Sequence, residues 1–310
     1  IAMWFAHKID YKYYSKIALI GLYVSLPLLF LTYKFGVNIN EASRWISIPI
    51  INMAFQPSDL AKLSLIIYLS SFLSKKQYDL ENIKTLIMPF LWIGLICLFI
   101  ALTNLSTALI LGATSILLMF ISRVKISHLS LLILFISISG GIALLTGQRG
   151  YTAISRVEDF INKKNLPYQL EQAYIAVSTG GLFGKGPGNS NQKNFLPQSS
   201  SDFIYAIIIE EYGFIVGVTI LILYLILLYR GLKIFIKSDR PFGGLLSAGL
   251  SFALVIQAVT NMCVVVGLLP VTGVTLPLVS MGGTSQLFTG ITIGIILSIS
   301  RENERELSYV

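Results

Sequence analysis

The chain has 310 residues, of which 55% are hydrophobic and only 12% are charged, and its mean hydropathy is +0.76. Soluble proteins carry a charge on about a quarter of their residues, so this composition excludes a soluble globular protein and indicates an integral membrane protein. The net charge of +8 comes from short basic clusters between apolar segments. Because no continuous basic face is present in the sequence, nucleic-acid binding is disfavoured.

The apolar segments predict transmembrane helices, because a helix needs about 20 apolar residues to cross a bilayer, whereas barrel strands alternate over about ten. We expect an all-α, polytopic helical membrane protein that forms one membrane domain over residues 1–310. Cys97 and Cys263 lie inside apolar segments, where a thiol behaves as a small hydrophobe, so they predict neither a disulfide framework nor a metal site. Eight complete spans are expected, at Ile17–Tyr33, Pro57–Leu73, Thr85–Leu102, Thr107–Ile121, Leu129–Leu145, Phe203–Tyr229, Leu245–Val266 and Gln286–Ser300.

The first residues, Ile1 to His7, are apolar but too few to cross a membrane. They lack the basic start and the small-residue cleavage site of a signal peptide. They look like the end of a helix whose beginning is missing. We therefore expect an N-terminal helix fragment in a truncated chain.

A charged pair opens the second span. Pro57 suits the first turn of a helix, and Asp59 favours the positive end of the helix dipole. Lys62 follows three residues later, on the same face, near the mouth of a span where a charge is costly unless it is paired or hydrated. The pair is predicted to be functional, and the alternative is a local structural ion pair.

A four-residue polar turn, Thr103 to Ser106, joins two apolar segments and predicts a helical hairpin. Asn104 in this turn can cap the second helix. The sequence leaves that role and a functional role equally open.

A long polar insert, residues 147–201, interrupts the apolar pattern. Loops of this length are uncommon unless they are functional, so we expect helices near 156–160 and 169–178 and a role in chemistry. Five glycines between Gly180 and Gly188 allow close approach to a ligand, and Lys185 and Gln192 offer donors for an anionic or sugar-bearing substrate.

Asp202 stands where this insert meets the apolar run that follows it. A carboxylate at such a border can have its pKa tuned by its surroundings, and it is the first candidate for a catalytic group. The apolar run is long enough to be broken at Gly213.

The stretch Gly267 to Thr284 combines two prolines and four glycines with apolar residues. It predicts a broken or re-entrant segment, which a membrane protein tolerates where protein covers it or where it lines a wet cavity. Alternation of the spans places the short basic loops on one side, taken as cytoplasmic, and the insert, this stretch and the Asn104 turn on the other. All the suspected chemistry is therefore expected to face outward.

With these motifs placed, the chain resembles the SEDS family (shape, elongation, division and sporulation) of polytopic peptidoglycan polymerases, FtsW and RodA, and slightly favours the FtsW branch. The resemblance covers nearly the whole chain. It rests on ASRW at 42–45, FQPSDLAKL at 55–63, GGLFGKGPGNSNQKNFLPQSSSDFIYAIIIEEYG at 180–213, GLLPVTGVTLPLVSMGGTS at 267–285 and SISR at 298–301.

The resemblance implies that Asp202 is the catalytic carboxylate and that Asp59 and Lys62 line an outward cavity. Family members usually have Glu where Asp59 stands, and many carry an acidic residue in the turn where this chain has Asn104 or Ser106. They also have ten spans, so one span and most of another are expected to be missing here. The residues predicted to bind substrate are Lys62, Asp59, Arg44, Lys185, Gln192, Asn104, Ser280, Gly282, Gly283 and Thr284.

The function implied is glycosyl transfer from lipid II onto a growing glycan strand at the outer face of the cytoplasmic membrane, for division or elongation, with release of undecaprenyl pyrophosphate. A divalent cation, Mg²⁺ or Mn²⁺, is expected to assist, without protein metal ligands being assigned. A class B penicillin-binding protein and the divisome or elongasome are the expected partners. The alternative is a transporter or flippase for a polyprenyl-linked precursor, opposed by ionisable residues at span ends instead of the midplane and by the lack of an internal repeat.

Overall fold

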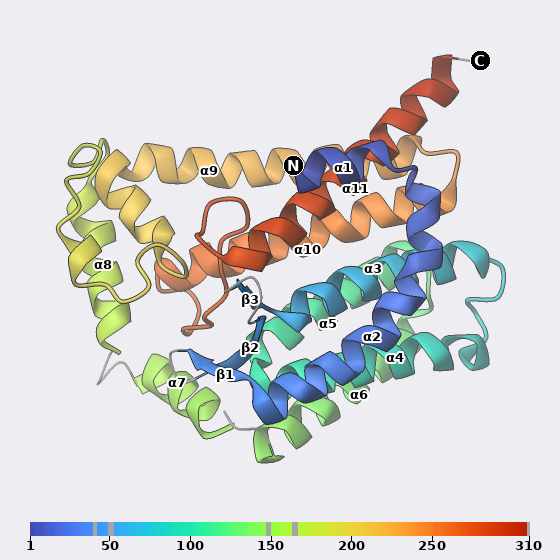
Figure 1. Cartoon of the computed structure of the whole chain (residues 1–310), viewed down its shortest axis with the longest axis horizontal. Helices are drawn as coiled ribbons and strands as arrows, with labels where there is room; N and C mark the ends of the chain where they lie inside the picture. Colours follow the sequence, from blue (N-terminus) through green and yellow to red (C-terminus); the bar gives the residue numbers. More distant parts are fainter. Residues whose placement is uncertain (40–41, 49–52, 147–149, 163–166, 309–310) are drawn as a thin grey trace. The chain divides into compact units, whose positions relative to one another are not determined.

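The computed structural model describes residues 1–39, 42–48, 53–146, 150–162 and 167–308 (Figure 1). Almost all of the regular structure in these residues is helical, as predicted. The helices are α1 (Ala2–Lys8), α2 (Tyr14–Phe35), α3 (Pro57–Lys75), α4 (Ile83–Thr103), α5 (Leu105–Ile121), α6 (Ile126–Thr146), α7 (Gly150–Asn162), α8 (Tyr168–Gly180), α9 (Ile204–Lys237), α10 (Pro241–Val265) and α11 (Gly283–Ser308), with single 3₁₀ turns η1 (Tyr11–Tyr13) and η2 (Gln192–Asn194).

Each of the eight predicted spans coincides with a helix, but these helices are not equally suited to a bilayer. Six described helical segments are long and apolar enough to cross a membrane. Helix α5 has only 17 residues, and α3, with 19, is not among the six. The shortfall in α3 has a physical cause, since it carries the Asp59 and Lys62 charges in its first two turns. The six segments are Tyr11–Phe35, Ile83–Thr103, Ile126–Thr146, Ile204–Lys237, Pro241–Val265 and Gly283–Arg305.

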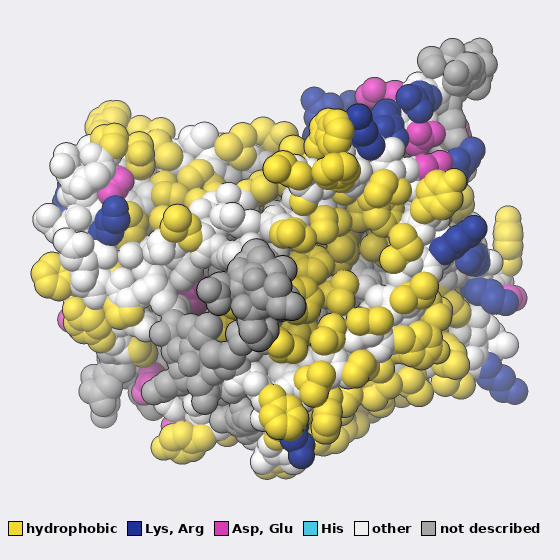
Figure 2. Space-filling view, viewed as in Figure 1, with side chains coloured by type: hydrophobic (Ala, Val, Ile, Leu, Met, Phe, Trp, Pro, Cys, Tyr) yellow, Lys and Arg dark blue, Asp and Glu magenta, His cyan; other side chains and the backbone are white. Residues whose placement is uncertain are grey.

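The chain divides into two compact units, and the first comprises residues 1–150, 228–253 and 283–310. Here α2 packs on α3, α4 packs on α5 and α6, and α1 packs on α11. Small residues permit the close approaches: a Cβ on Gly21 would lie 2.3 Å from the Ser64 hydroxyl, and one on Gly294 would lie 2.5 Å from the Met3 carbonyl. Figure 2 shows apolar side chains spread over one face of the molecule, with Lys and Arg gathered near the end of α11.

A small antiparallel sheet in the first unit was not predicted. Strands β1 (Val37–Ile39), β2 (Ala42–Ile48) and β3 (Met53–Phe55) pair in the order β1-β2-β3, with Ile46 opposite Phe55. Residues 34–56 lie between the first two predicted spans. Strands of three to seven residues contain too few positions for a two-residue alternation to stand out.

The second unit comprises residues 151–227 and 254–282. It contains α7 and α8, which confirm the two helices expected within the insert. Residues 266–282 are not helical, which confirms the break predicted in the Pro/Gly stretch. Helix α9 is kinked at Gly213, where φ is 84° and ψ is 172°, and the part after the kink is still long enough to span, since about 20 residues suffice.

Two glycines bring the kink and the glycine-rich loop into direct backbone contact. A Cβ on Gly213 would lie 2.2 Å from the Leu182 carbonyl oxygen, and a Cβ on Gly184 would lie 2.3 Å from that of Glu211. Both glycines also have a positive φ, which side chains disfavour. The loop therefore packs against the kink only because neither position carries a side chain.

Replacing Gly213 by Ala should destabilise the protein by at least about 1–3 kcal/mol, the usual cost of forcing a side chain into such a backbone conformation. The matched control is Gly140→Ala in α6, where a Cβ would meet no atom within 4 Å and where Ala in a helix interior gains about 0.5–1 kcal/mol over Gly. Thermal unfolding of the two purified variants in detergent tests this difference. Equal melting temperatures would show that the kink does not need glycine.

Candidate active site

Asp202 lies in a turn immediately before α9 and is half-buried. Three consecutive carbonyl oxygens of this turn accept hydrogen bonds from other segments of the second unit. The Met281 N–H donates to Ser200 (2.8 Å), the Ser280 hydroxyl to Ser201 (2.6 Å) and the Asn261 amide to Asp202 (2.7 Å). The backbone that carries the candidate catalytic carboxylate is thus fixed at each residue from 200 to 202.

The non-helical stretch that supplies two of these donors is itself held by side chains. The Asn261 amide also donates to the Val274 carbonyl (2.7 Å), Gln257 donates to the Thr275 carbonyl (3.0 Å), and the Tyr224 hydroxyl donates to the Pro277 carbonyl. Carbonyls that an α-helix would satisfy internally are satisfied here by side chains of α9 and α10. This arrangement explains how the stretch is tolerated in an apolar setting.

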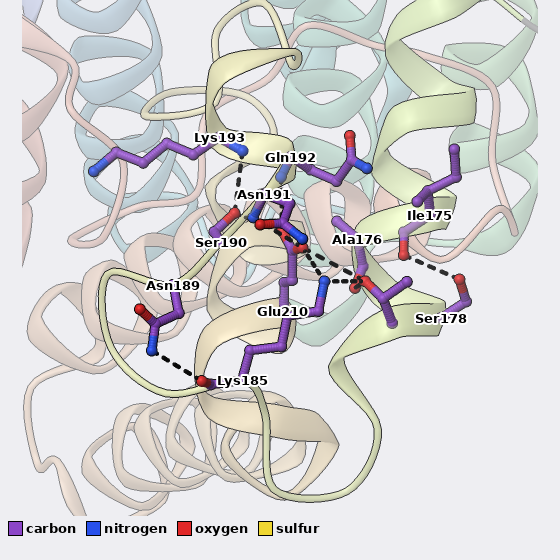
Figure 3. Close-up of polar contacts among 11 residues, drawn as sticks. Ile175, Ala176, Ser178, Lys185, Asn189, Ser190, Asn191, Gln192, Lys193 and Glu210 are labelled. Carbon is purple, nitrogen blue, oxygen red and sulfur yellow. Dashed lines mark hydrogen bonds and ion pairs between the residues drawn. The ribbon is translucent and has the colours of Figure 1, made fainter.

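A second polar cluster surrounds Glu210, whose side chain is fully buried (Figure 3). Its Oε1 lies 2.6 Å from the Lys185 ammonium and accepts from the Asn191 N–H, while its Oε2 accepts from the Ser190 hydroxyl and the Gln192 N–H. A buried carboxylate that accepts from an ammonium, a hydroxyl and two backbone amides is favoured in its ionised form. Glu210 therefore holds the glycine-rich loop against the first turns of α9.

This cluster determines where two predicted binding residues stand. The Lys185 ammonium is bonded to Glu210 and to the Thr179 hydroxyl (2.9 Å), so its charge is balanced by a carboxylate of α9. Gln192 contributes its backbone N–H to Glu210, and its side-chain Oε1 is buried without a partner among the described residues. Their predicted roles in binding substrate stay predictions.

Asp59 and Lys62 form the ion pair expected from their spacing on α3, with Oδ1 of Asp59 2.8 Å from Nζ of Lys62. The Asp59 side chain is 5% exposed and that of Lys62 is 19% exposed. Oδ2 of Asp59 is buried and has no hydrogen-bond partner in the described part of the chain. The carboxylate is thus only half satisfied, in contrast to that of Glu210.

The remaining predicted residues of the first unit have structural contacts. Asn104 caps α5, and its side-chain oxygen accepts from the Thr107 N–H (3.4 Å), which is the capping alternative left open by the sequence. The Thr284 hydroxyl, at the start of α11, accepts from the Gln56 N–H (3.2 Å) and lies 3.4 Å from the Ala54 carbonyl oxygen. It thereby ties β3 and the start of α3 to α11.

Three predicted residues can be placed only by their backbones. Gly282 ends the non-helical stretch, and Gly283 begins α11. Arg44 belongs to β2, but its side chain lies outside the described residues.

The predicted site residues fall into two groups, one in each compact unit. Asp202, Lys185, Gln192 and Ser280 belong to the second unit, and Asp59 and Lys62 belong to the first. Within the second unit, the ammonium of Lys185 contacts Glu210.

Asn261 and Glu210 were not predicted to have a role, although the sequence contains a signal for both. Each is a polar residue within a largely apolar helix, where such a side chain is expensive and often functional. Among the described residues, no three His, Cys, Asp or Glu side chains come together as they do in an all-protein metal site.

Comparison with known proteins gives a match to the model of the FtsW/RodA/SpoVE family, described as cell cycle proteins, over residues 1–305. Stage V sporulation protein E of Bacillus subtilis is 34% identical over 311 residues, covering 97% of this chain and 83% of the relative. A probable peptidoglycan glycosyltransferase FtsW of Geobacter metallireducens is 34% identical over 305 residues, covering 96% and 81%.

Solved structures give the same fold. A chain from a structure on coordination of polymerisation and crosslinking by a peptidoglycan synthase complex superposes with a TM-score of 0.78 at 25% identity, covering 97% of this chain and 86% of that one. The rod shape determining protein RodA of Thermus thermophilus, in a variant form, has a TM-score of 0.71 at 24% identity, covering 97% and 84%. The apolar helices and the whole-length match together show that the chain is an integral membrane protein that belongs to the FtsW/RodA/SpoVE family of cell cycle proteins.

Proposed function

We propose that this protein is a peptidoglycan glycosyltransferase that polymerises lipid II into glycan strands at the outer face of the cytoplasmic membrane, for division or elongation. The observation that carries the proposal is its 34% identity, over 96% of the chain, to a relative named as a peptidoglycan glycosyltransferase. The held turn around Asp202 supplies a carboxylate at the border between a polar loop and a helix, and a carboxylate can act as the general base that the reaction needs.

In the proposed reaction, a hydroxyl of the acceptor sugar attacks the anomeric carbon of the donor sugar. Asp202 takes the hydroxyl proton as the new carbon–oxygen bond forms. The bond between the anomeric carbon and the pyrophosphate breaks, and undecaprenyl pyrophosphate leaves with the electron pair. General base catalysis of this kind contributes about 10²- to 10⁴-fold to a rate.

The leaving pyrophosphate needs a fixed positive charge, and Lys62 is the best candidate. Its ammonium is partly exposed and its partner carboxylate is bonded through one oxygen only, whereas Lys185 is held by a fully buried carboxylate. A cation that meets charge developing in the transition state lowers the barrier. A divalent cation is proposed to assist here, held largely by the pyrophosphate, because Mg²⁺ usually needs only one or two protein carboxylates beside substrate phosphates.

The likeness to a chain of a peptidoglycan synthase complex supports a transpeptidase of the class B penicillin-binding proteins as the partner, within a divisome or elongasome. Such a partner would cross-link the strands that this protein polymerises.

Replacing Asp202 by Asn should leave insertion and folding normal and reduce lipid II polymerisation by roughly 10²-fold or more, because the variant keeps the shape but loses the base. The measurement is the rate of polymerisation by purified enzyme. If Asp202 only caps α9, Asn will substitute almost without loss, since Asn caps as well as Asp. Near-normal polymerisation by the folded variant would remove the catalytic assignment.

Replacing Lys62 by Ala should cost about 10²-fold in polymerisation, the usual cost of losing one charge-stabilising donor. This change also leaves the buried Asp59 carboxylate without its lysine partner. The matched control is therefore the double variant Asp59→Asn/Lys62→Met, which leaves no unpaired charge. If Lys62 holds the pyrophosphate, both variants lose activity, and the double variant does so at normal stability. Recovery of activity in the double variant would show that the pair is structural.

The proposed orientation predicts that a cysteine at Ser200 reacts with an impermeant thiol reagent in intact spheroplasts, whereas one at Asp239 does not. Both positions are exposed on the protein, and Cys97 and Cys263 are replaced by Ala in both variants to remove background labelling. Reaction at position 239 alone would reverse the orientation.

A further inference from the structure

We propose that Asn261 and Ser280 are positioning residues for Asp202, and that they fix the carboxylate by holding the backbone of its turn. The inference rests on the proposed function, because it assumes that Asp202 is the base. It assigns Asn261 a role in the reaction and gives Ser280, which the sequence suggested as a substrate contact, a different one.

The two side chains bond adjacent carbonyls of the same turn. Asn261 Nδ2 lies 2.7 Å from the Asp202 carbonyl oxygen, and Ser280 Oγ lies 2.6 Å from that of Ser201. Both residues are almost fully buried, at 2% and 3% exposure. Both bonds are made to backbone carbonyls and not to the Asp202 carboxylate, so they restrict the position of Asp202 through its backbone.

Each donor is itself fixed at a second point. Asn261 Nδ2 also donates to the Val274 carbonyl at 2.7 Å, and Ser280 Oγ accepts from the Leu276 N–H at 2.7 Å. The turn, helix α10 and the 274–280 stretch are therefore joined in one hydrogen-bonded unit. A displacement of the turn, of α10 or of the 274–280 stretch would therefore shift the backbone of Asp202, which carries the carboxylate.

The chemistry of position 261 suits this role. Both neighbours of its amide are carbonyl oxygens, which only accept, so the NH₂ group and not the oxygen must face them. Two donors on one nitrogen are required, which Leu and ionised Asp do not have. A buried amide in a largely apolar helix is costly. The two carbonyls satisfy its NH₂ group, while Oδ1 of Asn261 is buried without a partner among the described residues.

Positioning matters because proton abstraction depends on where the base stands. A misplacement of about 1 Å at a reacting group costs about 10²-fold in rate. A residue that acts by positioning should lower kcat and leave the KM for lipid II nearly unchanged, whereas a substrate contact made in the ground state should raise KM.

The test compares Asn261→Leu, Ser280→Ala and Ser280→Thr with the parent enzyme in lipid II polymerisation, with thermal stability measured for each. Asn261→Leu and Ser280→Ala should lower kcat, by up to about 10²-fold, at unchanged KM, and Ser280→Thr, which keeps the hydroxyl, should retain most of the rate. The matched control is Thr260→Val in α10, which should behave as the parent. Among the described residues, the Thr260 hydroxyl bonds only the Ile256 carbonyl of its own helix.

A double variant separates positioning from general stability. Adding Asn261→Leu to Asp202→Asn should cause no further loss, because the residual rate no longer uses the base that Asn261 positions. Losses that multiply, a raised KM at normal kcat, or normal kcat in a folded Asn261→Leu enzyme would each overturn the inference. If Asn261→Leu does not fold, Ser280→Ala, which removes a single oxygen, decides by the same criteria.

Failure of this inference is distinguishable from failure of the proposed function. If Asp202→Asn keeps its activity, Asp202 is not the base and the proposed mechanism is wrong. If Asp202→Asn loses activity while the folded Asn261 and Ser280 variants keep kcat, only the positioning role is wrong.

Discussion

Backbone that leaves the helical conformation within a membrane protein must find its hydrogen bonds inside the protein, because hydrocarbon offers none. The stretch 266–282 meets this constraint through side chains, with Asn261, Gln257 and Tyr224 bonding its carbonyls. The same stretch then supplies donors to the turn at 200–202. The non-helical stretch 266–282 is held by hydrogen bonds from side chains, and it in turn fixes the geometry of the turn that contains Asp202.

Glu210 provides a second point of attachment on the other side of Asp202. It lies eight residues further along the chain. Its carboxylate binds the glycine-rich loop through Lys185, Ser190 and the backbone amides of Asn191 and Gln192. The backbone adds to this, since the N–H of Lys185 bonds the Glu210 carbonyl at 2.9 Å. Asp202 therefore lies in a segment held at both ends, which favours a carboxylate of fixed position.

Hydrophobic patterning was sufficient for much of the fold. The eight helices, the two helices of the insert, the kink at Gly213 and the break after α10 all followed from apolar length and from glycine and proline positions. The small sheet was not predicted because its strands are short. The β-branched residues between two spans also do not show by themselves whether the segment forms paired strands. Asp59 and Lys62 could be paired from their spacing alone, since an i,i+3 contact is fixed by the helix itself.

Contacts between distant parts of the sequence could not be predicted in this way. Lys185 and Gln192 suggested ligand binding because they were polar residues in a glycine-rich loop, yet the partner of both is a glutamate on α9. Asn261 was passed over because its partners, Asp202 and Val274, are backbone carbonyls, which leave no trace in the sequence. Only the tertiary structure brings these groups together.

The two buried acids differ in a way that separates structure from chemistry. Glu210 has partners on both oxygens, supplied by one contiguous loop, and a carboxylate so fully satisfied has little capacity left for a ligand. Asp59 is paired only through Oδ1 with a lysine one helical turn away, and its buried Oδ2 has no partner among the described residues. An unmet buried acceptor is costly, so a ligand or a proton that bonded Oδ2 of Asp59 would be stabilised there. The unmet Oδ2 of Asp59 supports the proposed role of the Asp59–Lys62 pair in binding substrate, and the fully bonded carboxylate of Glu210 supports a structural role for the Glu210–Lys185 pair.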